Sequence, residues 1–198
     1  MHYSNWKSVP IPKKMNAMRR DKRGYPIPFI VVTGEDGTPY FTANHEPRRL
    51  RCILENRCSI CGTRLDSSVW LVGGPVSAFH EFGAYRDPGL HHECMEYALR
   101  VCPYLAAPRY MGRIDDANIA YDNLPAGVIG FLDPTMIAVR PDVFVAVGAR
   151  RQIVTPGGEN VRPSKPYVAV EFWREGERIS AEAAEPMLAE YARKVASL

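Results

Sequence analysis

Two pairs of side chains that bind metals stand out in the sequence. Cys58 and Cys61 are separated by two residues and followed by a glycine, which permits the tight turn that directs two thiolates at one ion. The second pair comes from the run Gly-Leu-His-His-Glu-Cys that ends at Cys94. Residues three apart share a helix face, so His91 and Cys94 can reach one ion, whereas His92 points elsewhere. The spacing predicts a zinc site of Cys58, Cys61, His91 and Cys94.

A site with four protein ligands is closed to water and substrate, so we expect one Zn²⁺ per chain with a structural role. Cys52 and Cys102 lie on apolar helical stripes and are more typical of small core residues, although either could replace His91. The alternative without metal is a reduced cysteine pair beside an ordinary histidine. With two short strands between a knuckle and a helix, the order of elements predicts a treble-clef zinc finger.

The composition is that of a folded chain. Of 198 residues, 46% are hydrophobic, and 25 Lys and Arg face 22 Asp and Glu. This excludes global disorder and fits one compact domain or two small lobes. The odd count of 5 cysteines favours a reducing compartment. The N-terminus lacks the apolar core of a secretory signal, and no apolar run approaches the roughly 18 residues of a membrane span. We therefore expect a cytoplasmic protein without membrane contact.

Basic residues are concentrated in residues 1–24 and around the first cysteines. Such clusters can contact phosphates, and Tyr and Trp side chains near the first one could stack on bases. They are equally typical of a solvated tail and a solvated helix face. The candidate nucleic-acid-binding residues are Lys13, Lys14, Arg19, Arg20, Arg48, Arg49 and Arg51.

The hydrophobic pattern predicts an α+β fold in three parts. Residues 1–24 form a basic extended arm, residues 25–112 a zinc-binding treble-clef-like lobe, and residues 113–198 a small antiparallel strand-rich lobe with a C-terminal helix. The expected strands are 29–33, 40–42, 69–72, 76–79, 136–139, 143–147 and 167–173. The expected helices run from Pro47 to about residue 55, over 88–102 with Asp87 as cap, and from the cap Ser180 onward with a kink or restart at Pro186.

Residue patterns for catalysis are weak. An HNH-type nuclease on a treble clef needs an ordered His and Asp or Asn constellation, whereas the stretch between the metal pairs lacks an Asp-His dipeptide and a correctly spaced Asn. The acidic residues Asp115, Asp116 and Asp122 are typical of a solvated loop. The Gly-Gly after Thr155-Pro156 lacks the Lys of a phosphate-binding loop. The nuclease is therefore the least favoured hypothesis.

An ordered series of motifs spans roughly residues 10–115. It comprises Arg23-Gly-Tyr-Pro-Ile-Pro-Phe29, Cys58-x2-Cys61-Gly62, Gly74-Pro75, Asp87-Pro88, His91-x2-Cys94-x3-Ala98-x3-Cys102-Pro-Tyr-Leu105 and Pro108. In this order the motifs resemble a family of small, functionally uncharacterised zinc-knuckle proteins of actinobacteria, plasmids and their phages. The resemblance implies a mobile-element origin and His91 rather than His92 as ligand, and it implies no activity. A weaker likeness continues over residues 170–176.

Two non-catalytic functions follow as expectations. The first is a zinc protein that acts as an interaction module on a host or phage protein, by analogy with other small phage proteins that act by binding. The alternative is a nucleic-acid-binding zinc-finger protein that uses the arm and the face of Arg48, Arg49 and Arg51.

Overall fold

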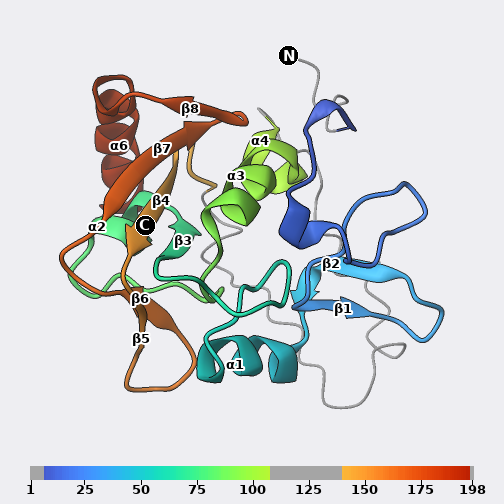
Figure 1. The fold of residues 1–198 in the computed structure, drawn as a ribbon. Coiled ribbons are helices and arrows are strands. Elements are labelled where there is room, and N and C mark those ends of the chain that lie inside the picture. The colour runs from blue at the N-terminus through green and yellow to red at the C-terminus, as the bar shows by residue number, and fades with distance from the viewer. Residues whose placement is uncertain (1–6, 108–139, 197–198) are drawn as a thin grey trace.

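The computed structural model describes residues 7–107 and 140–196 of the chain (Figure 1). The predicted boundary near residue 113, the strand predicted at 136–139 and the acidic residues Asp115, Asp116 and Asp122 lie outside these residues. Within them the fold is α+β, with antiparallel sheets and a C-terminal helix.

A four-stranded antiparallel sheet forms the centre of the molecule. Its order is β3 (Val69–Gly73), β4 (Phe144–Ala149), β7 (Ala169–Arg174) and β8 (Glu177–Ile179). Val69 pairs with Ala149, and Phe144 pairs with Trp173. β3 precedes the predicted boundary between the lobes and the other three strands follow it, so one sheet contains strands from both halves of the sequence.

Helices cover both faces of this sheet. All of β4 is buried, as its apolar run of Phe, Val and Ala requires. Phe144 and Ala146 pack in the cluster that contains Met95 of α3 (His92–Val101). Val145 and Val147 pack against α2 (Pro75–Phe79) and α6 (Ala181–Ala196) instead. The alternation of side chains along a strand thus gives three layers, with α3 on one face and α2 and α6 on the other.

The segment before the sheet contains the predicted hairpin and helix. β1 (Val31–Thr33) pairs antiparallel with β2 (Pro39–Asn44), and α1 (Glu46–Leu54) follows, with Pro47 in its first turn. The described part of the basic arm packs on the same body. A short 3-10 helix, η2 (Lys13–Met15), buries Met15 at 2% exposure in the main core.

A second small hairpin joins the two halves of the sequence again. β5 (Gln152–Val154) pairs with β6 (Val161–Pro163), and Val161 packs with Ile53 of α1, Leu71 of β3 and Tyr85. The backbones of Tyr85 and Val161 exchange two hydrogen bonds of 2.9 Å. The segment between the two metal pairs is therefore held by the second half of the chain.

Two predicted elements were wrong in type or extent. The apolar run Val76–Phe79 belongs to the helix α2, not to a strand, because Gly74-Pro75 starts a helix and the run is too short for its periodicity to decide. The helix predicted from residue 88 begins at His92, and Asp87 is not its cap. Leu90 and Trp70 form a β-bridge, which keeps the chain extended up to His91.

The helices near the ends of the described ranges follow the expected signals. α3 ends before Cys102, and a short helix, α4 (Pro103–Ala106), follows it. Ser180 caps α6, because its Oγ accepts a hydrogen bond of 3.2 Å from the backbone N–H of Ala183. Pro186 lies inside α6. None of the helices in the described residues has the length and apolarity that crossing a membrane requires.

Candidate metal centre

The first cysteine pair lies on a hydrogen-bonded turn. The N–H of Gly62 donates to the carbonyl of Cys58 over 2.9 Å, and the N–H of Cys58 donates to Thr63 over 2.8 Å. Gly62 has φ +74°, a conformation that residues with a Cβ rarely adopt. The N–H of Phe29 donates to Ile60 over 2.7 Å, which attaches the turn to the segment leading into β1. This turn points both thiols to the same side.

Replacing Gly62 by alanine is expected to destabilise the turn. A Cβ would meet the Phe29 ring at 2.7 Å and would also strain the left-handed backbone, at a cost of about 1–2 kcal/mol for the backbone alone. The control is Gly37→Ala, because Gly37 has φ +81° and a Cβ added there would meet no atom within 4 Å. In urea unfolding, Gly62→Ala should lose more stability than Gly37→Ala. Equal losses would show that the contact with Phe29 has no cost.

The second pair lies at the start of α3. His91 is the N-cap residue and Cys94 is in the first turn, so both side chains face the cysteine turn. Ser59 connects the two segments, because its N–H donates to Gly89 and its hydroxyl donates to Pro88, both over 3.1 Å. The predicted i, i+3 pair is therefore brought to the knuckle, although the helix starts later than expected.

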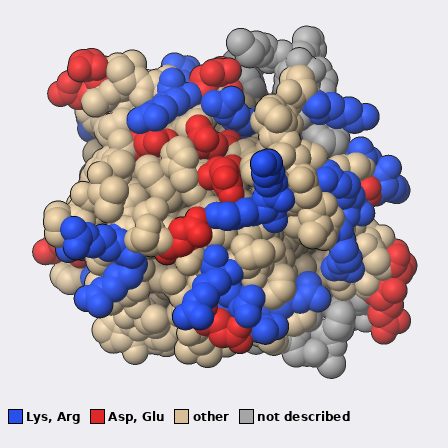
Figure 2. Space-filling view, viewed as in Figure 1, with Lys and Arg blue, Asp and Glu red and all other residues tan. Residues whose placement is uncertain are grey.

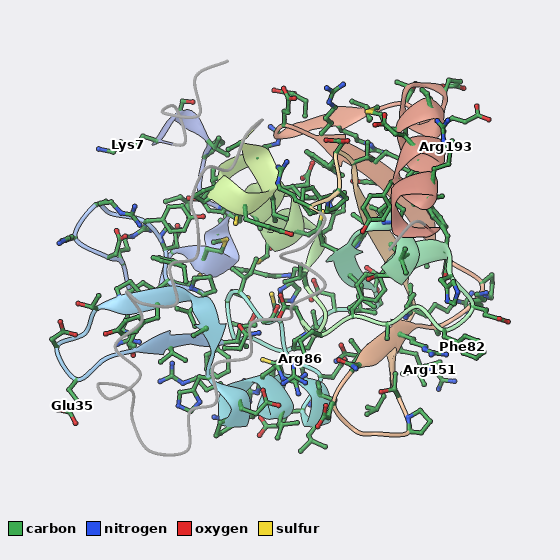
Figure 3. The ribbon with its side chains drawn as sticks, turned by 180° about the vertical axis from the view of Figure 1, so that it is seen from behind. Lys7, Glu35, Phe82, Arg86, Arg151 and Arg193 are labelled. Carbon is green, nitrogen blue, oxygen red and sulfur yellow. The ribbon has the colours of Figure 1, made fainter. Side chains whose placement is uncertain are left out.

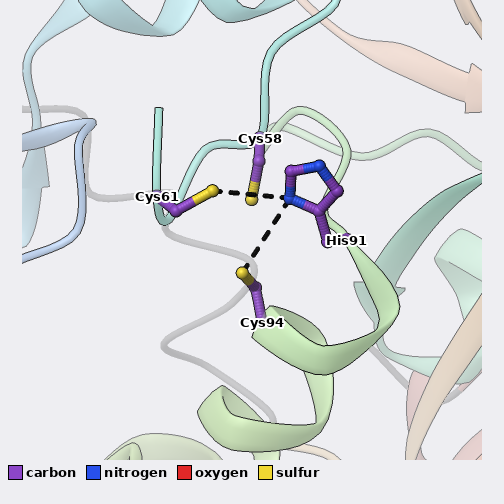
Figure 4. Close-up of side chains that lie close together, drawn as sticks. All are labelled: Cys58, Cys61, His91 and Cys94. Carbon is purple, nitrogen blue, oxygen red and sulfur yellow. Dashed lines mark hydrogen bonds between the residues drawn. The ribbon is translucent and has the colours of Figure 1, made fainter. Parts of the chain in front are cut away.

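The four side chains converge on one point (Figure 4). One ligand atom of each of Cys58, Cys61, His91 and Cys94 lies within 4.8 Å of the others. Nδ1 of His91 is 3.4 Å from Sγ of Cys61 and 4.0 Å from Sγ of Cys94. Tetrahedral Zn–S and Zn–N bonds of about 2.3 and 2.0 Å place S and N about 3.5 Å apart. The group could therefore hold one metal ion, with three of its residues buried and Cys61 half-buried.

The histidine is oriented by a backbone carbonyl. Nε2 of His91 lies 3.0 Å from the carbonyl oxygen of Arg64, which only a protonated Nε2 can contact as a donor. In the neutral ring Nδ1 then carries the free lone pair, and it is the nitrogen that faces the sulfurs of Cys61 and Cys94. This second interaction is typical of histidines that bind metals. The sequence alone could not identify the Arg64 carbonyl as the partner of His91, because every residue has a backbone carbonyl.

The side chains of this group lie close enough together to shift the pKa values of Cys61, His91 and Cys94. The Cys58 and Cys61 sulfurs raise the pKa of His91 to about 10. Hydrogen bonds from Cys58 and Cys94 lower the pKa of Cys61. Hydrogen bonds with Cys58 and Cys61 raise the pKa of Cys94. The lowered pKa of Cys61 favours its thiolate, whereas the raised pKa values of His91 and Cys94 favour their protonated forms, and a bound divalent ion would have to displace those protons.

The other candidate ligands lie elsewhere. Sγ of Cys52 is directed at the carbonyl of Cys58, 3.8 Å away, and burial raises the pKa of Cys52 to about 12. Nε2 of His92 pairs with the buried Glu171 at 3.1 Å, and the His92 ring packs on Trp70. Cys102 is outside the four-residue group. Among the described residues no second group of His, Cys, Asp and Glu has metal-binding geometry.

The basic residues predicted to bind nucleic acid differ in their burial and in their ion pairs. Arg49 does not lie on the surface, since its side chain is 0% exposed and pairs with Glu46. Lys14 forms ion pairs with Asp66 and Glu93, and Arg51 pairs with Glu55. Lys13, Arg19 and Arg20 are exposed, and Arg48 is half-buried. Figure 2 shows Lys and Arg mixed with Asp and Glu over much of one face.

No known protein family, curated protein or solved structure matches the chain. The resemblance to zinc-knuckle proteins of actinobacteria and their phages therefore depends on the quoted motifs, and the Cys₃His group is the part of it that the structure supports.

Proposed function

We propose that Cys58, Cys61, His91 and Cys94 hold one structural zinc ion in a treble-clef-like arrangement. The chemistry of three thiols and one imidazole favours zinc over harder cations. Four protein ligands complete a tetrahedron, so the ion would supply folding free energy. The knuckle at Cys58 and the position of His91 and Cys94 at the start of α3 support this arrangement, whereas the second strand predicted between them is the helix α2.

We further propose that the protein acts by binding another protein, of the host or of a phage. The observation that carries this proposal is an aromatic surface, defined as Val76, Phe79 and Phe82 in and after α2. These side chains are 39%, 51% and 69% exposed. Phe82 lies at the edge of the molecule in the view of Figure 3. Exposed phenylalanines that are close in the chain are typical anchors of protein interfaces.

The aromatic surface is held in place before any partner binds. The N–H of Gly83 donates to His80 over 2.9 Å, and the N–H of Phe82 donates to Nδ1 of the same histidine over 3.2 Å. Arg162 donates to the carbonyl of Phe82 over 2.9 Å. Because these bonds fix the turn, a partner would not bear the entropy cost of ordering it. A partner with an apolar groove that accepts two phenyl rings fits this surface.

Protein binding is preferred to nucleic-acid binding for this chain. Arg49 is buried and the charges of Lys14 and Arg51 are already paired with carboxylates, so fewer of the predicted contacts can reach a phosphate backbone. Affinity for nucleic acid grows with the number of such contacts.

Replacing Phe82 by serine is expected to abolish capture of the partner from an actinobacterial lysate. Loss of a hot-spot aromatic costs about 2–4 kcal/mol, which weakens binding at least about thirtyfold. The matched control is Leu54→Ser, because Leu54 is 83% exposed on α1, outside the aromatic surface. A specific protein should be retained by the wild type and by Leu54→Ser after nuclease treatment. Capture that survives Phe82→Ser, or that nuclease destroys, would contradict the proposal.

A further inference from the structure

A cavity of about 340 Å³ lies beside the cysteine turn, between the basic arm and α1. Such a volume is at the lower end of small-molecule sites, roughly 300–1,000 Å³. The arm supplies Met18 and Arg19, α1 supplies Arg48, and the turn supplies Cys61 and Thr63. Ile27, Phe29 and Ile60 add apolar walls. The cavity thus combines apolar sides with basic groups from two separate segments.

Two arginines of this cavity have no acidic partner among the residues that the structure describes. Arg48 lies over the Phe29 ring, 5.8 Å from its centroid, and Arg19 contacts the hydroxyl of Thr33 at 3.3 Å. Burial lowers the pKa of Arg48, and the nearby charge of Arg19 lowers it further. The third basic residue, Lys14, is already paired with Asp66. Arg19 is exposed and Arg48 is half-buried, so two neighbouring cations line the cavity without a carboxylate partner in the described part of the chain, and an anion could contact both.

We propose that this cavity binds a small phosphate ester whose organic part is planar or apolar. Arg19 and Arg48 would contact the phosphate, because the guanidinium group forms paired hydrogen bonds to phosphate oxygens. Phe29 and the aliphatic side chains would pack against the organic part. The site is separate from the aromatic surface and does not depend on the proposed protein partner.

Titration calorimetry on the full zinc-loaded chain tests this proposal with AMP as the probe. AMP is expected to bind with one site per chain, and adenosine, which lacks the phosphate, at least about tenfold more weakly because it cannot pair with the two arginines. Inorganic phosphate should compete with AMP. Absence of saturable AMP binding, equal binding of adenosine, or binding of a single-stranded oligonucleotide without AMP binding would each overturn the proposal.

Charge-matched variants locate the site. Arg48→Gln and Arg19→Gln should each weaken AMP binding at least about tenfold, since each removes a charged hydrogen-bond donor. The controls Arg51→Gln and Arg20→Gln remove the same charge from neighbouring positions that do not line the cavity, and they should change affinity less than about twofold. Equal losses in all four variants would overturn the proposal, because they would indicate attraction by net charge alone.

A second kind of variant, which fills the cavity with a larger side chain, tests the proposal if Arg48→Gln fails to fold. Ala17 lines the cavity from the exposed side of the arm, so Ala17→Phe reduces its volume without changing charge. AMP binding should be lost while the zinc content and melting temperature stay unchanged. Unaltered AMP binding by a folded Ala17→Phe protein would place the ligand elsewhere and overturn the proposal. Phe82→Ser should bind AMP normally, which separates this test from the test of protein capture.

Discussion

Removal of the metal from zinc-loaded protein is expected to lower the melting temperature by more than roughly 10 °C. Structural zinc sites contribute about 10 kcal/mol or more in small domains, and 1 kcal/mol shifts the melting temperature by about 2–4 °C in a chain of this size. Without the ion, three thiols and one imidazole stay crowded at the start of α3. Circular dichroism before and after chelation measures the change, and elemental analysis should give one zinc per chain beforehand.

Single substitutions separate the ligands from their neighbours. Cys94→Ser and His91→Ala should lose zinc and reproduce the chelated state. The controls Cys102→Ser and His92→Ala change the same residue types outside the four-residue group and should keep one zinc per chain. Retention of zinc by Cys94→Ser, or an unchanged melting curve after complete metal removal, would refute the structural role.

Arg49→Met is expected to reduce the free energy of unfolding by about 3–5 kcal/mol, the usual cost of breaking a buried ion pair. Arg49 is fully buried and its guanidinium donates to both carboxylate oxygens of Glu46. It also donates to the carbonyls of Arg86, at 2.9 Å, and Glu159, at 2.5 Å. Methionine fills much of the volume but cannot donate to any of these acceptors, although Glu46 keeps another donor, Arg86 at 3.2 Å. Urea unfolding measures the loss.

The control for this variant is Arg51→Gln, on the same helix. Arg51 pairs with Glu55 at 2.8 Å at the surface, where such pairs contribute at most about 1 kcal/mol. If Arg49→Met is as stable as Arg51→Gln, then Arg49 is not a structural residue. A loss of nucleic-acid binding at full stability would restore its predicted role as a phosphate contact.

The stability difference between wild type and Arg49→Met should depend on pH. The hydrogen bond from Arg49 lowers the pKa of Glu46 below its ordinary value of 4.5. A carboxyl with a lowered pKa stabilises the fold fully above its unfolded pKa, and this contribution disappears as the pH falls through the folded pKa. The difference should therefore be constant near neutral pH and narrow below pH 4.5. A difference that widens in acid would contradict this assignment.

Local signals in the sequence were sufficient to predict much of the candidate metal centre. Short-range spacing predicted both pairs of the four-residue group and favoured His91 over His92, because i, i+3 geometry also holds between the N-cap residue and the first turn of a helix. The hairpin at β1 and β2, α1 with its early proline, and α6 with the cap Ser180 were likewise predicted from local chemistry.

The features that the sequence did not predict depend on contacts between residues that are far apart in the chain. Arg49 has the appearance of a surface base on a basic helix, and only Glu159, far along the chain, completes its burial. The β-bridge between Leu90 and Trp70 is another contact between distant residues, and it makes α3 begin later than the sequence predicted. The run at Val76–Phe79 is too short to distinguish strand from helix, and so the exposed phenylalanines were not foreseen as a surface.

The pairing of β3 with β4 also bears on synthesis of the chain. Gly73 pairs with Val145, so β3 cannot pair until the ribosome has synthesised β4. Until then the apolar residues of β3 lie on a strand with an unpaired edge. Exposed strand edges of this kind recruit other chains. Messages truncated between these strands should therefore yield products that aggregate or are degraded, whatever their zinc content.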